Sequence, residues 1–99
     1  MKITFERSGG FAGLRLNAAF DTELLPDETA TALQRLVEDA DFFALPAILP
    51  GSPNTADMYQ YVVTVEDDTH SHTVTASEDA APDALRQLFD YLLRLARKR

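Results

Sequence analysis

Residues 58–67, Met58-Tyr59-Gln60-Tyr61-Val62-Val63-Thr64-Val65-Glu66-Asp67, decide the fold of this 99-residue chain. Tyr59, Tyr61, Val63 and Val65 occupy every second position, and this period of two is typical of a strand with one buried face. The turn Asp67-Asp68-Thr69 follows, and residues 70–77 alternate again. The stretch therefore predicts a β-hairpin.

A second hairpin is predicted at the N-terminus. Ile3 and Phe5 alternate with polar residues in residues 2–8, and alternation resumes at Leu14 and Leu16. Between these two runs lies Ser8-Gly9-Gly10-Phe11-Ala12-Gly13, which holds three of the four glycines of the chain. Glycine adopts positive φ without a Cβ penalty, so this segment is expected to turn sharply.

Each predicted hairpin is followed by a helical pattern. In residues 25–40, Leu33, Leu36, Val37 and Ala40 recur at the spacing of one helix face. A second helix is predicted from Pro82 onward, with an apolar stripe formed by Leu85, Leu88, Phe89, Leu92 and Ala96. The order β-β-α-β-β-α predicts an α+β domain over residues 1–99, with a four-stranded antiparallel sheet of two hairpins and two helices on one face.

Residues 46–54 hold three prolines and a glycine, which predicts a loop inside the domain. Just before it, Phe42, Phe43 and Leu45 are expected to fold back into the core. Ile48 and Leu49 are unusually apolar for a loop. They either cover the core or form a contact surface.

Charge restricts the choice of partners. Sixteen acidic and nine basic residues give a net charge of −7, and an acidic surface repels phosphate backbones and anionic lipid. We therefore expect neither nucleic acid nor membrane as a partner, and the basic residues near the C-terminus suit the end of a helix. The chain has no cysteine, no secretory leader pattern and no long apolar run, so a soluble cytoplasmic protein is expected.

The residues assemble no recognisable catalytic motif. Phosphate-loop, dinucleotide and zinc-protease signatures are absent from the sequence. His70 and His72 share one face of a predicted strand and could hold a metal with Glu66 or Asp68, but two histidines alone are weak evidence for a metal site. We expect them to lie at the rim beside the turn. No enzyme activity, cofactor or metal is predicted.

The glycine segment is the remaining candidate for function. Phe11 either packs beneath the sheet or protrudes as an aromatic anchor, and a buried anchor can contribute roughly 2–4 kcal/mol to binding. Gly9, Gly10 and Gly13 would let the main chain approach a partner closely.

Residues 3–14, Ile-Thr-Phe-Glu-Arg-Ser-Gly-Gly-Phe-Ala-Gly-Leu, resemble the N-terminal signature of the emfourin-like family. The resemblance extends through Leu24-Leu25-Pro26, Asp41-Phe42-Phe43, Tyr61-Val62-Val63-Thr64-Val65 and the leucine-rich C-terminal helix. The family consists of small bacterial inhibitors of thermolysin-like metalloproteases, protealysin among them. The resemblance implies a cytoplasmic inhibitor that blocks the active-site cleft of such a protease and carries no metal.

The residues expected to contact the protease are our own inference, and we expect a monomer when the chain is free. Phe11 or Leu14 could fill the pocket for the bulky apolar side chain just after the scissile bond. The expected contact residues are Ser8, Gly9, Gly10, Phe11, Ala12, Gly13, Leu14, Ile48 and Leu49. Two alternatives stay open: a non-inhibitory interaction module or small adaptor subunit, and a small metal-dependent enzyme.

Overall fold

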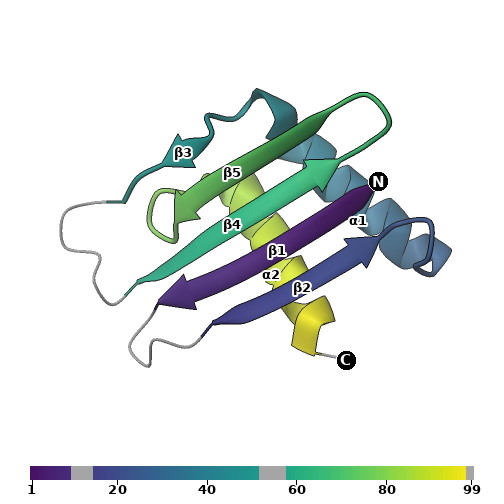
Figure 1. Ribbon diagram of the computed structural model, residues 1–99, viewed down its shortest axis with the longest axis horizontal. Helices are drawn as coiled ribbons and strands as arrows, with labels where there is room; N and C mark the ends of the chain where they lie inside the picture. The colour runs from purple at the N-terminus through teal and green to yellow at the C-terminus, as the bar shows by residue number, and fades with distance from the viewer. Residues whose placement is uncertain (10–14, 52–57, 98–99) are drawn as a thin grey trace.

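Five strands form one mixed sheet in the order β2-β1-β4-β5-β3 (Figure 1). The computed structural model describes residues 1–9, 15–51 and 58–97. The strands are β1 (Lys2–Gly9), β2 (Leu16–Asp21), β3 (Ile48–Leu49), β4 (Tyr59–Glu66) and β5 (Ser71–Ser77). The helices are α1 (Asp27–Asp39), the short 3-10 helix η1 (Phe42–Ala44) and α2 (Asp83–Arg97).

The two predicted hairpins pair through their first strands. β1 lies antiparallel to both β2 and β4, and β4 lies antiparallel to β5. Phe5 is therefore opposite Ala18 on one side and Val63 on the other, and all three side chains are buried. The alternation seen in the sequence thus predicts the buried face of each long strand correctly.

The expectation of a four-stranded, wholly antiparallel sheet is wrong. Ile48 and Leu49, predicted to lie in a loop, form a fifth strand parallel to β5. The Thr75 N–H donates to the Ala47 carbonyl at 2.8 Å, which anchors this segment to the sheet. Pro46 and Pro50 flank the strand, and proline has no N–H for a ladder, so β3 is only two residues long.

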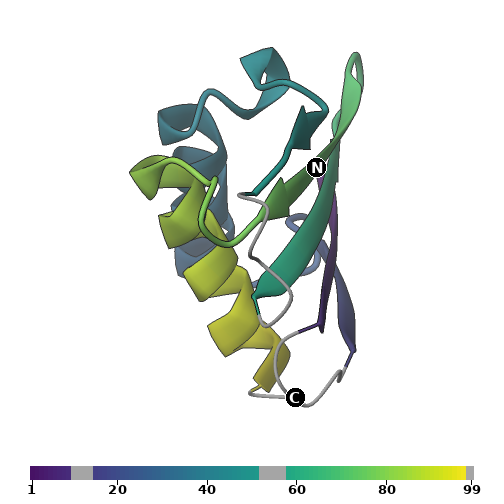
Figure 2. The ribbon, with the colours of Figure 1, turned by 90° about the vertical axis from the view of Figure 1, so that its left-hand side faces the viewer.

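Both helices cover the same face of the sheet, as predicted, and leave the other face bare (Figure 2). Leu33 and Val37 of α1 are buried, together with Leu85, Leu88, Phe89 and Leu92 of α2. Each fully buried side chain of this size contributes about 1.5–3 kcal/mol to folding. Within the described ranges, no helix is long and apolar enough to cross a bilayer.

The segment after α1 is only partly in the core. Asp41 adopts the left-handed conformation (φ 50°), which ends the helix and turns the chain into η1. Phe42 is buried and Leu45 packs against the core, as expected. The expectation for Phe43 is wrong: it is 36% exposed and lies edge-on to Phe42, with 6.0 Å between the ring centroids.

Candidate functional site

Gly9, the last residue of β1, is the register partner of Tyr59, the first residue of β4. The chain therefore leaves β1 and enters β4 at the same end of the sheet (Figure 1). We call this the Gly9 end. The described residues stop at Gly9 here and resume at Met58, the residue before Tyr59.

Glycine is required at position 9 for two reasons. Its φ is +86°, a conformation that side chains other than glycine rarely adopt. In addition, a Cβ atom placed there would lie 3.0 Å from the Met58 carbonyl oxygen. The N-terminal glycine segment thus begins with a close approach between two backbones.

An aromatic and cationic cluster braces the Gly9 end. The Arg7 side chain lies over the Tyr59 ring, with 4.0 Å between its guanidinium carbon and the ring centroid. Such a contact contributes about 0.5–1 kcal/mol at an exposed site and more when it is shielded from water. Arg7 and Tyr59 belong to different strands, so the contact joins β1 to β4 beside their last backbone pair.

Tyr61 extends this cluster into the core. Its ring stacks on Phe89 of α2, with centroids 4.3 Å apart and planes 11° from parallel. Burial raises the pKa of the Tyr61 hydroxyl, and a hydrogen bond from Arg7 partly opposes that rise. Tyr61 therefore ties the Gly9 end of the sheet to α2.

Two hydrogen bonds between Glu78 and Tyr59 complete the brace. The Glu78 N–H donates to the Tyr59 carbonyl at 3.0 Å, and the Tyr59 N–H donates to Glu78 Oε1 at 3.3 Å. A surface hollow of about 240 Å³ lies beside these residues and is lined by Met58, Tyr61, Glu78, Asp79, Arg86, Phe89 and Asp90.

Gly51 is a second constrained glycine. A Cβ atom there would overlap the side chains of Ser77 and Asp79, which are themselves joined by a hydrogen bond of 2.6 Å from Ser77 Oγ to Asp79 Oδ1. The chain leaving β3 thus passes tightly against the end of β5. Sequence reasoning assigned no such role to Gly51, Arg7 or Glu78.

Only part of the predicted contact set lies in the described residues. Ser8 is half-buried and pairs with Gln60, and Gly9 has been described above. Gly10, Phe11, Ala12, Gly13 and Leu14 lie outside the described residues, so the choice between a buried and a protruding Phe11 stays a prediction.

Ile48 and Leu49 were expected either to cover the core or to form a contact surface, and the structure shows that only Leu49 covers the core. Leu49 packs against the core, whereas Ile48 is 67% exposed. Ile48 pairs with Thr75, Thr75 with Val62, and Val62 with Glu6. Three strand spacings, roughly 14 Å, therefore separate Ile48 from β1. Ile48 and Gly9 are not in contact, but Ile48 lies in a row of side chains on the bare face of the sheet.

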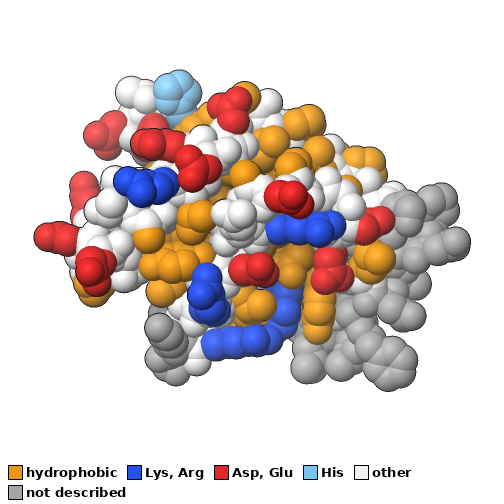
Figure 3. Space-filling view, turned by 180° about the vertical axis from the view of Figure 1, so that it is seen from behind, with side chains coloured by type: hydrophobic (Ala, Val, Ile, Leu, Met, Phe, Trp, Pro, Cys, Tyr) orange, Lys and Arg blue, Asp and Glu red, His pale blue; other side chains and the backbone are white. Residues whose placement is uncertain are grey.

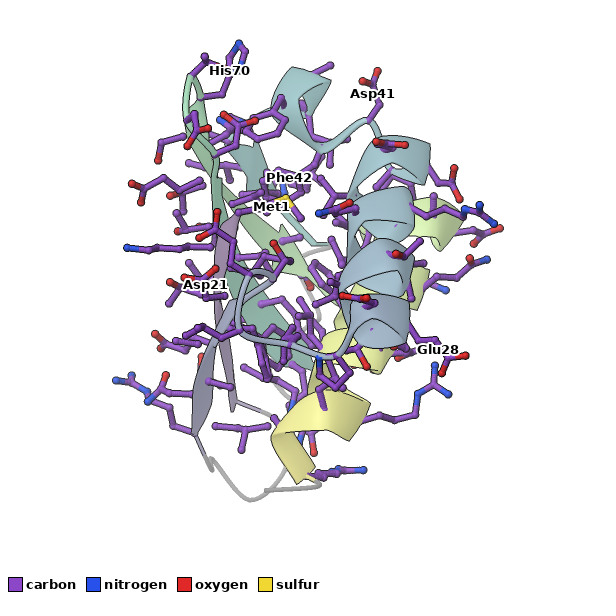
Figure 4. The ribbon with its side chains drawn as sticks, turned by 90° about the vertical axis from the view of Figure 1, so that its right-hand side faces the viewer. Met1, Asp21, Glu28, Asp41, Phe42 and His70 are labelled. Carbon is purple, nitrogen blue, oxygen red and sulfur yellow. The ribbon has the colours of Figure 1, made fainter. Side chains whose placement is uncertain are left out.

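The rings of both histidines lie against phenylalanine rings. The ring of His72 contacts Phe42, and its Nε2 lies 2.7 Å from the Leu45 carbonyl oxygen. His70 lies against Phe43 at the tip of the β4–β5 turn (Figure 4). The described part of the chain contains no group of three or more histidine, aspartate or glutamate side chains placed to hold a metal.

Acidic side chains gather at the end of the sheet opposite Gly9. A hollow there is lined by Met1, Lys2, Asp21, Glu23, Glu66, Asp67 and Asp68. The N–H groups of Thr69 and His70 donate to the Asp67 carboxylate and hold its pKa below the ordinary value. This carboxylate orders the turn between β4 and β5.

A more voluminous hollow lies away from the Gly9 end. It measures about 680 Å³, is open to solvent and is lined by seven residues of α1 with Gln87 of α2. Figure 3 shows this helix-covered face, on which charged side chains surround apolar ones. Nothing in this hollow resembles a catalytic arrangement.

The fold and the Gly9 end define a small α+β protein with a braced sheet end. The sequence model of the emfourin family matches residues 5–93, and the chain belongs to that family. Membership in this family indicates a metalloprotease inhibitor role in general, which is consistent with the expectation of a protein without enzyme activity. Searches of curated proteins and of solved structures give no match.

Proposed function

We propose that this chain inhibits a thermolysin-like, protealysin-type zinc metalloprotease by blocking its active-site cleft. Residues 8–14 enter the cleft, and Phe11 or Leu14 fills the pocket for the apolar side chain just after the scissile bond. The observation that carries this proposal is the brace around Gly9 in a member of the emfourin family.

The brace matters because an inhibitor must stay bound without being turned over. Arg7, Tyr59 and Tyr61 fix the point where the segment leaves β1, and Phe89 fixes Tyr61 from the helix side. Preorganisation of this kind lowers the entropic cost of binding.

The rest of the contact area is proposed to come from the bare face near the Gly9 end. A stable inhibitor complex buries about 1,200–2,000 Å² in total, more than one short segment supplies. The row Glu6, Val62, Thr75 and Ile48 leads across this face. Ile48 is its exposed apolar end, and Leu49 supports it from the core side. We further propose that the free chain is a cytoplasmic monomer.

The test is inhibition of peptide hydrolysis by several purified thermolysin-like proteases. We expect tight inhibition by the parent chain and a loss of about tenfold or more for Phe11→Ala. Phe43→Ala is the matched control, because Phe43 is a partly exposed phenylalanine of η1 and is expected to leave inhibition unchanged. An absence of inhibition at micromolar parent chain across these enzymes would refute the proposal.

A second candidate function is a non-inhibitory interaction module or adaptor subunit. It is favoured by the exposed Ile48 at the edge of the sheet. Co-purification from the source cell separates the two, because a bound partner that is not a zinc protease would support the adaptor and argue against the inhibitor.

A further inference from the structure

β2 leaves one row of backbone groups unpaired. Within the described ranges its only strand neighbour is β1. The Thr22 N–H donates to the Met1 carbonyl at 2.9 Å, and bonded pairs alternate along an antiparallel ladder. Leu16, Ala18 and Phe20 therefore bond to β1, while Asn17, Ala19 and Asp21 direct their backbone groups outward.

These outward groups form a usable edge. Asn17 and Ala19 each present one N–H and one C=O, and their side chains are exposed. The Asp21 carbonyl already accepts the Leu24 N–H at 2.9 Å, so Asp21 presents mainly its N–H. A row of this kind pairs readily with another extended chain.

The opposite edge of the sheet, formed by β3, is less able to pair with another strand. β3 has two residues and is flanked by Pro46 and Pro50, which have no N–H to donate. β2 has six residues and no proline. The sheet can therefore extend along β2 far more readily than along β3.

We propose that the β2 edge binds an extended segment of the target protease as an additional strand. The inference rests on the proposed function and identifies the surface that works with residues 8–14. β2 begins two residues after position 14, so a protease that binds residues 8–14 lies close to Asn17 and Ala19.

The side chains around the edge define the segment that fits. Ala19 is small and exposed at the centre of β2, so the facing residue can be bulky. Arg15 lies near the start of the strand, where its Nε is 3.4 Å from Glu6 Oε1. The partner segment is thus extended, offers free backbone N–H and C=O groups, and carries no proline at the paired positions.

Amide hydrogen exchange measured by NMR tests the inference directly. In the free chain, the amides of Asn17, Ala19 and Asp21 should exchange quickly and those of Ala18 and Phe20 slowly. Addition of a protease that the chain inhibits should slow the first set by about tenfold or more. Unchanged exchange at Asn17 and Ala19 in the inhibited complex overturns the inference.

Ala19→Pro provides a second test, because it removes the central outward N–H without removing a bond to β1. We expect its inhibition constant to rise by about tenfold, which corresponds to 1.4 kcal/mol. Ala19→Ser keeps the N–H and should stay within about twofold of the parent, as surface substitutions usually do. Equal inhibition by Ala19→Pro and the parent overturns the inference, and thermal unfolding of both variants reports on folding.

Two further outcomes separate this inference from the proposed function. If the parent chain inhibits no thermolysin-like protease, the proposed function fails. If the parent inhibits and the outward amides stay unprotected, only the β2 inference fails. Protection of these amides on concentrating the free chain, with dimers in analytical ultracentrifugation, would assign the edge to a second copy and overturn the inference.

Discussion

The guanidinium carbon of Arg7 lies 4.0 Å from the centroid of the Tyr59 ring and joins the end of β1 to the beginning of β4. Because Arg7→Met removes this contact, it is expected to lower the free energy of unfolding by about 1 kcal/mol. Urea denaturation measures this change.

Arg15→Met is the control for that variant. Arg15 is also an arginine beside the glycine segment, but it is 67% exposed and its ion pair with Glu6 is solvated. Its loss should cost less than about 0.5 kcal/mol. If Arg7→Met and Arg15→Met lower the free energy of unfolding equally, Arg7 does not stabilise the Gly9 end.

Replacing Gly9 is expected to destabilise the sheet end. Gly9→Ala forces a Cβ into a positive-φ position and towards the Met58 carbonyl, at a cost of about 1–2 kcal/mol in the free energy of unfolding. Ser8→Ala, one residue earlier in the same strand, should change it by less than about 0.5 kcal/mol. Thermal unfolding measures the stability of both variants. A Gly9→Ala variant as stable as the parent would contradict the requirement for glycine at position 9.

Alkaline pH should destabilise the protein through Tyr61. Its folded-state pKa is raised, mainly by burial. The stabilising contribution is therefore complete below the unfolded pKa of about 10 and is lost as pH rises through the higher folded value. We expect the parent to lose thermal stability above about pH 10 more steeply than Tyr61→Phe. Parallel melting curves for the two proteins would refute this.

Ile48 and Leu49 should respond in opposite ways to substitution. Ile48→Ser removes an exposed side chain, so stability should change by less than about 0.5 kcal/mol while the inhibition constant rises severalfold. Leu49→Ala removes a side chain packed on the core and should cost about 1–2 kcal/mol of stability. Unchanged inhibition by Ile48→Ser would exclude Ile48 from the protease interface.

The long elements were predictable because their period of two or 3.6 residues reflects burial on one side. Thus Phe5, Val63 and Leu88 were assigned to the core, where they are fully buried. β3 was not predictable, because two residues between prolines carry no period and their pairing with Thr75 depends on tertiary contacts. Phe43 was misplaced for a similar reason, since composition cannot distinguish which of two adjacent phenylalanines faces inward.

The candidate site was predictable only in part. The glycine cluster predicted a sharp turn, which stays a prediction because residues 10–14 lie outside the described ranges, and the structure shows why Gly9 in particular must be glycine. The brace was missed because Arg7, a charged residue in an alternating strand, was assigned no role from the sequence. Arg7 does follow the parity of Ile3 and Phe5, which places it on the helix-covered side with Tyr59 and Tyr61. That parity is the signal that could have identified it.

The short β3 strand has a consequence for how many molecules can join the sheet. A sheet grows into a filament only if each unit can be extended at both borders, and the prolines beside Ile48 and Leu49 close one of them. If the β2 edge binds one protease segment as proposed, we expect a one-to-one complex, because β3 offers no second site of the same kind.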